Sequence, residues 1–186
     1  MKISVVIPCF NEINTISEII QKINKALNKY QFEVLVIDDC STDGSVELLE
    51  KLKLNNKNVR VIFNSKNLGK GASLRKGFDE AKGEIICIQD ADLEYDPNDL
   101  LPMIDLILNG SADVVIGSRF RGNGPVRANL FINRVANFII TNLTNIFTNL
   151  SLTDIECCYK VFKKDDIQKI NLIENRFGIE PELTIK

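Results

Sequence analysis

Two carboxylates, Asp90 and Asp92, stand two residues apart directly after an apolar run at 84–88. The run is predicted to be a buried strand, and in an extended backbone the side chains of residues i and i+2 point the same way, about 6.5–7 Å apart. The two carboxylates can therefore share one divalent cation, because Mg²⁺ and Mn²⁺ favour hard oxygen ligands together with substrate phosphates and water. An acidic pair at a turn is more often only solvated. Its place at the carboxyl end of a strand favours a functional role, because ligands of open α/β sheets bind there.

Candidate binding residues also follow three other predicted strands, at 3–7, 33–37 and 113–117. The residues concerned are Pro8, Phe10, Asn11 and Glu12 after the first, Asp38 and Asp39 after the second, and Arg119 after the third. A parallel sheet brings the carboxyl ends of its strands to one edge, so these groups can converge on one ligand. Each has a structural alternative; Asp39, for example, can cap the helix that follows it.

The Gly69-Lys70-Gly71 loop resembles a phosphate-binding loop. It lacks the first glycine of the Gly-x-x-x-x-Gly-Lys-Ser/Thr pattern, so it is not a P-loop. A Gly-x-Gly-x-x-Gly dinucleotide pattern is also missing after the first strand. Lys70 remains a candidate for contact with a ligand.

Residues 1–121 alternate predicted strands with predicted helices. Strands are expected at 3–7, 33–37, 59–63, 84–89 and 113–117. This alternation predicts an α/β fold with a mostly parallel central sheet and helices on both faces. The strands are nearly continuous runs of Val and Ile, which is typical of strands that are covered on both sides.

The pattern changes after this alternating part. Residues 122–125 are expected to form a flexible break, and 126–150 is a long segment with one apolar face, formed by residues 131, 135, 138, 139, 143, 146, 147 and 150. The common interpretation is a helix whose apolar face packs on the sheet. The alternative is a helix lying at a membrane surface, although its basic residues are few, Arg127 and Arg134.

The last part of the chain, 154–162, is expected to include a short strand. The sequence stops at 182–186 in what reads as a helix, so we expect a piece of a longer protein. We interpret 1–186 as one domain with two parts, 1–121 and 122–186.

Composition narrows the possible functions. The 186 residues are 45% hydrophobic and 26% charged, with a net charge of −2, so nucleic acid is not an expected partner. The chain has no histidine, which excludes imidazole-based triads, metal sites and acid–base chemistry. No signal peptide or long apolar run is visible, so we expect a cytoplasmic location without a membrane-spanning helix in this chain. Its five cysteines are expected to be reduced.

Five stretches carry a specific combination of motifs: Val5–Glu12, Val36–Gly44, Asn67–Gly71, Asp90–Glu94 and Gly117–Phe120. Together they resemble the family 2 glycosyltransferases, and within these the enzymes similar to dolichol- or polyprenyl-phosphate mannose synthases. The resemblance continues through Thr153-Asp154 and Phe177–Glu182 to the end of the chain. It implies a GT-A fold, a nucleotide-diphosphate sugar donor, Mg²⁺ or Mn²⁺ as cofactor, and inversion at the anomeric carbon. It also implies that 1–186 is a single catalytic domain with a nucleotide-binding half, 1–121, and an acceptor-side half, 122–186.

The resemblance also implies a role for each matching position. For nucleotide-sugar binding it implies Pro8, Phe10, Glu12, Ile37, Asp39, Asp90, Ala91, Asp92 and Arg119. For the metal it implies Asp90, Asp92 and Glu94, although family members often carry Gln or Ser where this chain has Glu94. The catalytic set it implies is Asp92, Arg119 and Asp154. Arg119 is expected to face the diphosphate or the acceptor phosphate, and Asp154 to act as a base or to position the acceptor; as a structural alternative, Asp154 caps a turn.

We therefore expect an inverting, metal-dependent transferase. It would move a sugar from a donor of the GDP-mannose or UDP-glucose type to a polyprenyl or dolichyl phosphate at the cytoplasmic face of a membrane. A phosphate nucleophile is already anionic and needs little general base, which suits a chain without histidine. Three alternatives stay open: transfer to a saccharide hydroxyl, a nucleotidyltransferase, and a receiver-like regulatory domain without catalysis.

Overall fold

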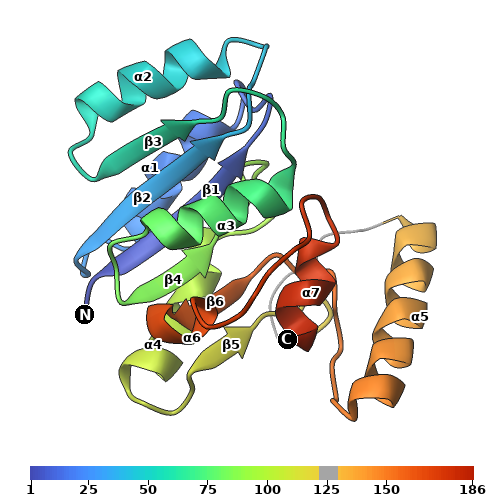
Figure 1. The fold of residues 1–186 in the computed structure, drawn as a ribbon. Coiled ribbons are helices and arrows are strands. Elements are labelled where there is room, and N and C mark those ends of the chain that lie inside the picture. Colours follow the sequence, from blue (N-terminus) through green and yellow to red (C-terminus); the bar gives the residue numbers. More distant parts are fainter. Residues whose placement is uncertain (122–129) are drawn as a thin grey trace.

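Six strands form one sheet at the centre of the protein (Figure 1). The structure is a computed structural model, and it describes residues 1–121 and 130–186. The expected flexible break at 122–125 and Arg127 lie outside the described residues. The strands are β1 (Ile3–Cys9), β2 (Phe32–Asp38), β3 (Val59–Phe63), β4 (Ile85–Ile88), β5 (Val114–Ile116) and β6 (Lys160–Lys163), in the spatial order β3-β2-β1-β4-β6-β5.

The sheet is mostly parallel, as predicted. β1 pairs in parallel with β2 and β4, and β3 pairs in parallel with β2. β6 is antiparallel to both β4 and β5, so β5 runs in the same direction as β4. The carboxyl ends of β1, β2, β4 and β5 therefore meet at one edge, and the residues that follow them are brought to that edge.

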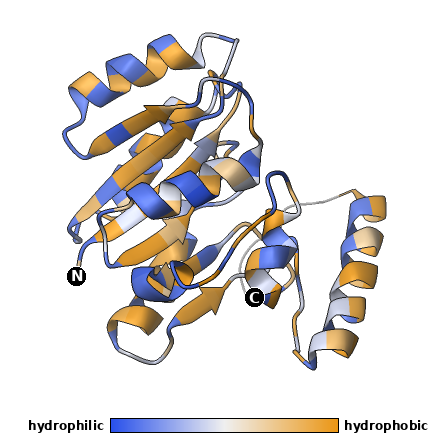
Figure 2. Ribbon diagram, in the orientation of Figure 1, coloured by the Kyte–Doolittle hydropathy of each residue, from blue (hydrophilic) through white to orange (hydrophobic). Residues whose placement is uncertain are grey.

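Helices cover both faces of the sheet, which confirms the predicted architecture. Their bounds are α1 (Ile16–Ala26), α2 (Ser45–Asn55), α3 (Lys70–Glu80), α4 (Leu100–Leu108), α5 (Phe131–Thr148), α6 (Lys164–Ile167) and α7 (Ile179–Ile185), with a 3₁₀ turn at Pro97–Asp99. Figure 1 shows α3 in front of the sheet and α1 behind it. The strands are predominantly apolar (Figure 2), and their side chains pack with those of the flanking helices into one core.

The orientation of α5 corrects the interpretation that its apolar face packs on the sheet. The helix stands beside the sheet (Figure 1), and its buried residues are polar: Asn137, Thr141 and Thr144. The outward face is apolar, with Phe147 85% exposed. The large exposed apolar residues in and next to this helix, called here the α5 apolar face, are Leu130, Phe131, Ile132, Phe138, Ile139, Ile140, Leu143, Ile146, Phe147 and Leu150.

Hydrogen bonds explain why the polar stripe of α5 faces inward. The segment 152–156 runs past the helix, and its backbone needs partners. Asn145 donates to the carbonyl of Leu152 and accepts from its N–H, at 2.9 and 2.8 Å. Thr141 Oγ1 accepts from the N–H of Ile155 at 3.2 Å, and Asn137 Oδ1 accepts from the N–H of Glu156 at 3.3 Å. The polar side chains of α5 thus satisfy this backbone, and the apolar side chains are left outside.

Within residues 1–121 and 130–186, no helix is both long enough and apolar enough to span a bilayer.

Candidate active site

A cleft of about 500 Å³ opens at the carboxyl edge of the sheet. Most of the residues predicted for nucleotide-sugar binding line it: Pro8, Phe10, Glu12, Asp39, Asp90, Ala91 and Asp92. Ile37 does not; it is fully buried in β2, beneath Gly77 of α3. Arg119 and Glu94 line a second cavity instead. The strand ends therefore converge as expected, but on two neighbouring cavities.

Asp39 holds the loop that leads into α3. Its carboxylate accepts hydrogen bonds from the backbone N–H groups of Leu68 and Gly69, the latter at 2.7 Å, and from Asn64 Nδ2 at 2.8 Å. The alternative in which Asp39 caps the helix after 41–43 is wrong, because the N–H of Ser45, the first residue of α2, donates to Asp43 instead. Asp39 is thus buried at the wall of the cleft and fixes the loop on which Lys70 stands.

The two glycines around Lys70 are required by close packing against a distant segment, which the sequence did not reveal. Gly69 has a φ of +98°, and a Cβ on it would collide with the backbone carbonyl of Asn175. A Cβ on Gly71 would collide with the carbonyl of Glu174. The glycines therefore allow the segment 174–175, about one hundred residues away in the chain, to pack directly against the loop.

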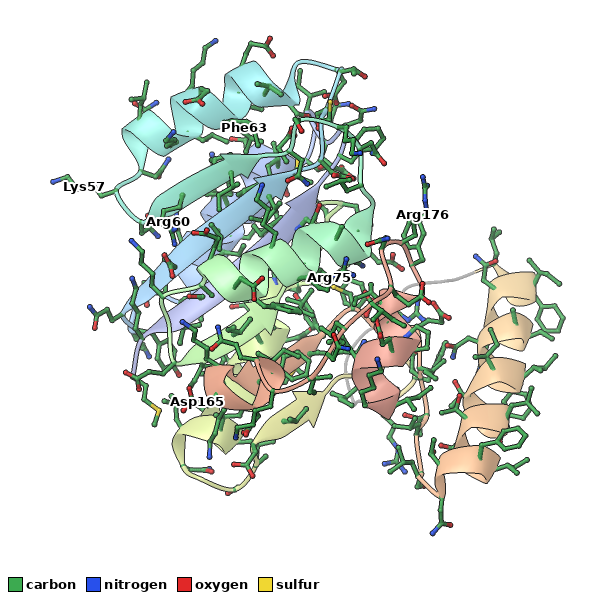
Figure 3. The ribbon with its side chains drawn as sticks, viewed as in Figure 1. Lys57, Arg60, Phe63, Arg75, Asp165 and Arg176 are labelled. Atoms are coloured by element: carbon green, nitrogen blue, oxygen red, sulfur yellow. The ribbon has the colours of Figure 1, made fainter. Side chains whose placement is uncertain are left out.

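This packing brings a C-terminal loop to the cleft. Arg75 of α3 donates to the carbonyl of Glu174 and to the side chain of Asn175. Arg176 and Phe177, which follow, line the cleft. Figure 3 shows Arg75 on α3 and the Arg176 side chain extending from the loop that precedes α7. The sequence motifs did not include Arg176. Its position next to the Phe177–Glu182 motif was the only feature of the sequence that pointed to the cleft.

Asp90, the first carboxylate of the acidic pair, is held in an ion pair. The ammonium group of Lys70 lies 2.7 and 2.9 Å from its two carboxylate oxygens and 2.8 Å from Glu180 Oε1. The other oxygen of Glu180 lies 2.6 Å from Lys160 Nζ, which is completely buried. Burial raises the pKa of Asp90, although Lys70 opposes the rise. Burial would lower the pKa of Lys70, but electrostatic interactions with Cys158, Asp90 and Glu180 raise it well above its ordinary value.

Asp92 is the exposed member of the pair. Its Oδ1 accepts from the N–H of Glu94 at 2.9 Å, which orients the carboxylate at the turn after β4. In the described part of the chain, Asp90, Asp92 and Glu94 do not assemble into a cluster of three metal ligands. Mg²⁺ and Mn²⁺ sites in nucleotide-binding proteins commonly use only one or two carboxylates, with phosphate and water as the other ligands. Asp92 fits such a site, and Asp90 is near it but paired.

The second cavity, of about 340 Å³, lies beside α5 and contains two arginines. The guanidinium groups of Arg119 and Arg134 lie 5.7 and 5.6 Å from the centre of the Phe120 ring. Glu94 and Glu156 also line this cavity, and burial raises the pKa of Glu156 above its ordinary range. A cavity with two guanidinium groups can bind an anion, and protonation of the half-buried Glu156 would favour that binding.

Arg119 is oriented by Asp154. The Nε and Nη2 atoms of Arg119 donate to the two carboxylate oxygens of Asp154, each at 2.8 Å, and the backbone N–H of Arg119 donates to Oδ2 at 2.9 Å. The Asp154 side chain is fully buried, whereas that of Arg119 is 24% exposed. The carboxylate is engaged on both oxygens, so this geometry suits a residue that positions Arg119. A role for Asp154 as a catalytic base stays a prediction.

Comparison with known sequences identifies the family. Residues 4–170 match the profile of glycosyl transferase family 2. The chain belongs to this family. Membership confirms the resemblance read from the motifs at the strand ends, and it leaves the nucleotidyltransferase and receiver-domain alternatives without support.

Relatives of the chain are named for transfer to lipid phosphates. It is 37% identical over 126 residues to the dolichol-phosphate mannosyltransferase of Pyrococcus furiosus, covering 68% of this chain and 35% of that protein. It is 26% identical over 177 residues to the dodecaprenyl-phosphate galacturonate synthase of Rhizobium johnstonii, covering 93% of this chain and 51% of that protein. The chain thus spans about half or less of the length of these relatives.

Solved structures share the fold. Glucosyl-3-phosphoglycerate synthase from Mycobacterium tuberculosis, in complex with Mn²⁺, UDP and phosphoglyceric acid, superposes with a TM-score of 0.73 at 20% identity, covering 97% of this chain and 61% of that one. A mannosyltransferase from Pyrobaculum calidifontis, in complex with GDP-mannose and Mn²⁺, gives a TM-score of 0.66 at 18% identity and covers 98% and 50%. These similarities confirm the GT-A fold.

Proposed function

We propose that the chain is the catalytic part of a glycosyltransferase that moves a sugar from a nucleoside-diphosphate donor to a polyprenyl phosphate. One observation carries the proposal: an acidic cleft at the edge of the sheet lies next to a cavity that combines two arginines with the α5 apolar face. The relatives named for transfer to dolichol phosphate and dodecaprenyl phosphate support the same acceptor class.

The donor is assigned to the 500 Å³ cleft. Phe10, half exposed at the end of β1, offers an apolar surface to a base, and Pro8, Glu12 and Asp39 shape the same end of the cleft. Asp92 and Arg176 lie at the part that would receive the diphosphate. A divalent cation held by Asp92 together with the diphosphate would supply Lewis-acid neutralisation of the leaving group. The Mn²⁺-bound structural relatives support such a cation, and either Mg²⁺ or Mn²⁺ suits carboxylate ligands.

The acceptor phosphate is assigned to the second cavity. Arginine forks match phosphate geometry, and Asp154 fixes the Arg119 fork in place. Arg134, whose guanidinium group lies 5.6 Å from the centre of the Phe120 ring, adds a second positive charge. Ile140 lines this cavity and also belongs to the α5 apolar face, so a charged head and a hydrocarbon chain can be bound side by side.

A membrane surface is the natural environment for the α5 apolar face. A helix with one exposed apolar face can lie in the interface between headgroups and acyl chains, and a polyprenyl phosphate is available there. The contact would place the second cavity at the cytoplasmic surface of a membrane, where nucleotide sugars are present. This is the arrangement that the sequence offered as the alternative to core packing.

The chemistry would be a direct displacement. An oxygen of the acceptor phosphate attacks the anomeric carbon as the bond from that carbon to the diphosphate oxygen breaks, which inverts the configuration. The attacking oxygen is already anionic, so no histidine is needed to remove a proton. Arg119 and Arg134 would orient the acceptor, and Asp92 would hold the cation that neutralises the diphosphate of the donor.

The test is a transfer assay with detergent-solubilised polyprenyl phosphate and, separately, soluble saccharide acceptors. Donors of the UDP and GDP series are supplied with Mn²⁺. We expect transfer to the lipid phosphate, and a loss of at least about tenfold in Arg134→Met, since one charge-assisted contact to phosphate contributes that much. Lys57→Met is the matched control, because Lys57 lies at the opposite end of the sheet (Figure 3). Transfer to saccharides alone, or full lipid transfer by Arg134→Met, would contradict the proposal.

A further inference from the structure

Lys70 is placed where a cation would otherwise meet the acidic pair. Its ammonium group contacts both oxygens of Asp90 at 2.7 and 2.9 Å, and its side chain is only 14% exposed. The backbone around Lys70 is held in place, because Asp39 accepts hydrogen bonds from the N–H groups of Leu68 and Gly69, and the segment 174–175 packs against the flanking glycines. Lys70 is therefore held beside Asp90.

The charges around Lys70 balance. Asp90 and Glu180 are the two carboxylates, and Lys70 and Lys160 are the two ammonium groups that contact them. These four buried or half-buried groups sum to zero. Of the Asp90–Asp92 pair, Asp90 is thus neutralised by Lys70, and the exposed Asp92 carries the uncompensated negative charge at the cleft.

We infer that Lys70 pairs with Asp90 in the nucleotide-free protein and so keeps this carboxylate from binding a divalent cation. The cation then binds tightly only together with the diphosphate of the donor. Two phosphate groups provide the oxygen ligands that Asp90 does not. The inference deepens the proposed function, on which its nucleotide half rests. It makes Lys70 a positioning residue that acts through Asp90 and that sets the order in which cation and nucleotide are bound.

A direct test is Mn²⁺ binding without nucleotide, measured by calorimetry and by the electron paramagnetic resonance signal of free Mn²⁺ at pH 8. In Lys70→Met the carboxylate of Asp90 loses its counter-charge, so we expect Mn²⁺ affinity to rise at least about tenfold, as a second hard carboxylate ligand becomes available. Lys82→Met is the matched control, because it removes the same charge from an exposed lysine just after α3. Its Mn²⁺ affinity should equal that of the wild type.

Two further measurements separate this role from a merely structural one. Adding Asp90→Asn to Lys70→Met should abolish the gain, and Lys70→Arg, which keeps a charge that can pair with Asp90, should show none. In the wild type, Mn²⁺ should bind at least about tenfold more tightly with UDP or GDP than without, since the diphosphate supplies the missing ligands. If Lys70→Met does not melt cooperatively, Lys70→Gln takes its place.

The inference is overturned if the folded Lys70→Met or Lys70→Gln protein binds Mn²⁺ no more tightly than the wild type, or if the wild type binds Mn²⁺ equally well without nucleotide. Failure of the proposed function has a different signature, because it would appear as no binding of UDP or GDP at all. The nucleotide-free comparison of Lys70→Met with Lys82→Met is unaffected by that outcome.

Discussion

The ion pair between Arg119 and Asp154 predicts an unequal cost for removing either partner. Three hydrogen bonds join the two residues across 35 positions of sequence. The Asp154 side chain has no exposure, whereas the Arg119 side chain is 24% exposed. Removing the arginine leaves a charge sealed from water, and removing the aspartate leaves a charge that water can reach. Arg119→Met should therefore destabilise the protein more than Asp154→Asn.

The magnitudes follow from general values. Breaking a buried ion pair by removing one partner costs about 3–5 kcal/mol. Arg119→Met should thus lower the free energy of unfolding by about 3–5 kcal/mol. Asp154→Asn keeps one acceptor and a solvated guanidinium group, so its cost should be about 2 kcal/mol.

Chemical denaturation followed by circular dichroism measures these differences, and for a chain of this size about 3 kcal/mol corresponds to roughly 6–12 °C in melting temperature. Asp113→Asn, which breaks the exposed pair with Lys163, is the control and should leave the midpoint unchanged. A larger deficit in Asp154→Asn than in Arg119→Met would refute the reasoning.

Three further outcomes are expected. Asp92→Asn should remove most of the Mn²⁺-dependent binding of UDP or GDP, and calorimetry that finds equal affinity in the mutant or in EDTA would rule out a metal role for this residue. Burial works against the charge of Glu33, but hydrogen bonds from Ser4, the N–H of Lys82 and Arg60 lower its pKa. Glu33→Gln should therefore cost about 2 kcal/mol of unfolding free energy at neutral pH, and this difference should close in acid as the wild-type carboxylate is protonated. A difference that widens in acid would contradict the lowered pKa of Glu33. Because Phe147 is 85% exposed, Phe147→Ser should leave the melting temperature unchanged while weakening cosedimentation with anionic vesicles, and unchanged cosedimentation would count against the α5 apolar face as a membrane contact.

The sequence by itself determined the layout of the sheet and the edge at which the chemistry lies. Continuous Val and Ile runs are typical of strands covered on both faces, and the alternation with helices leaves a mostly parallel sheet as the compact arrangement. Parallel strands place their carboxyl ends together, so the sequence alone assigns Pro8, Asp39, Asp90 and Arg119 to one edge. These are consequences of local pattern and of the chirality of chain connections, which a single sequence carries.

Only the tertiary structure decided which groups at that edge contact one another. Lys70 pairs with Asp90 across 20 residues, and Asp154 orients Arg119 across 35. Such pairs depend on loop geometry and on the antiparallel entry of β6, neither of which leaves a periodic trace in the sequence. The orientation of α5 has the same origin. Amphipathic spacing predicts that a helix has an apolar face, but not which way that face points. The polar face of α5 packs on the protein because the backbone of 152–156 needs its hydrogen bonds.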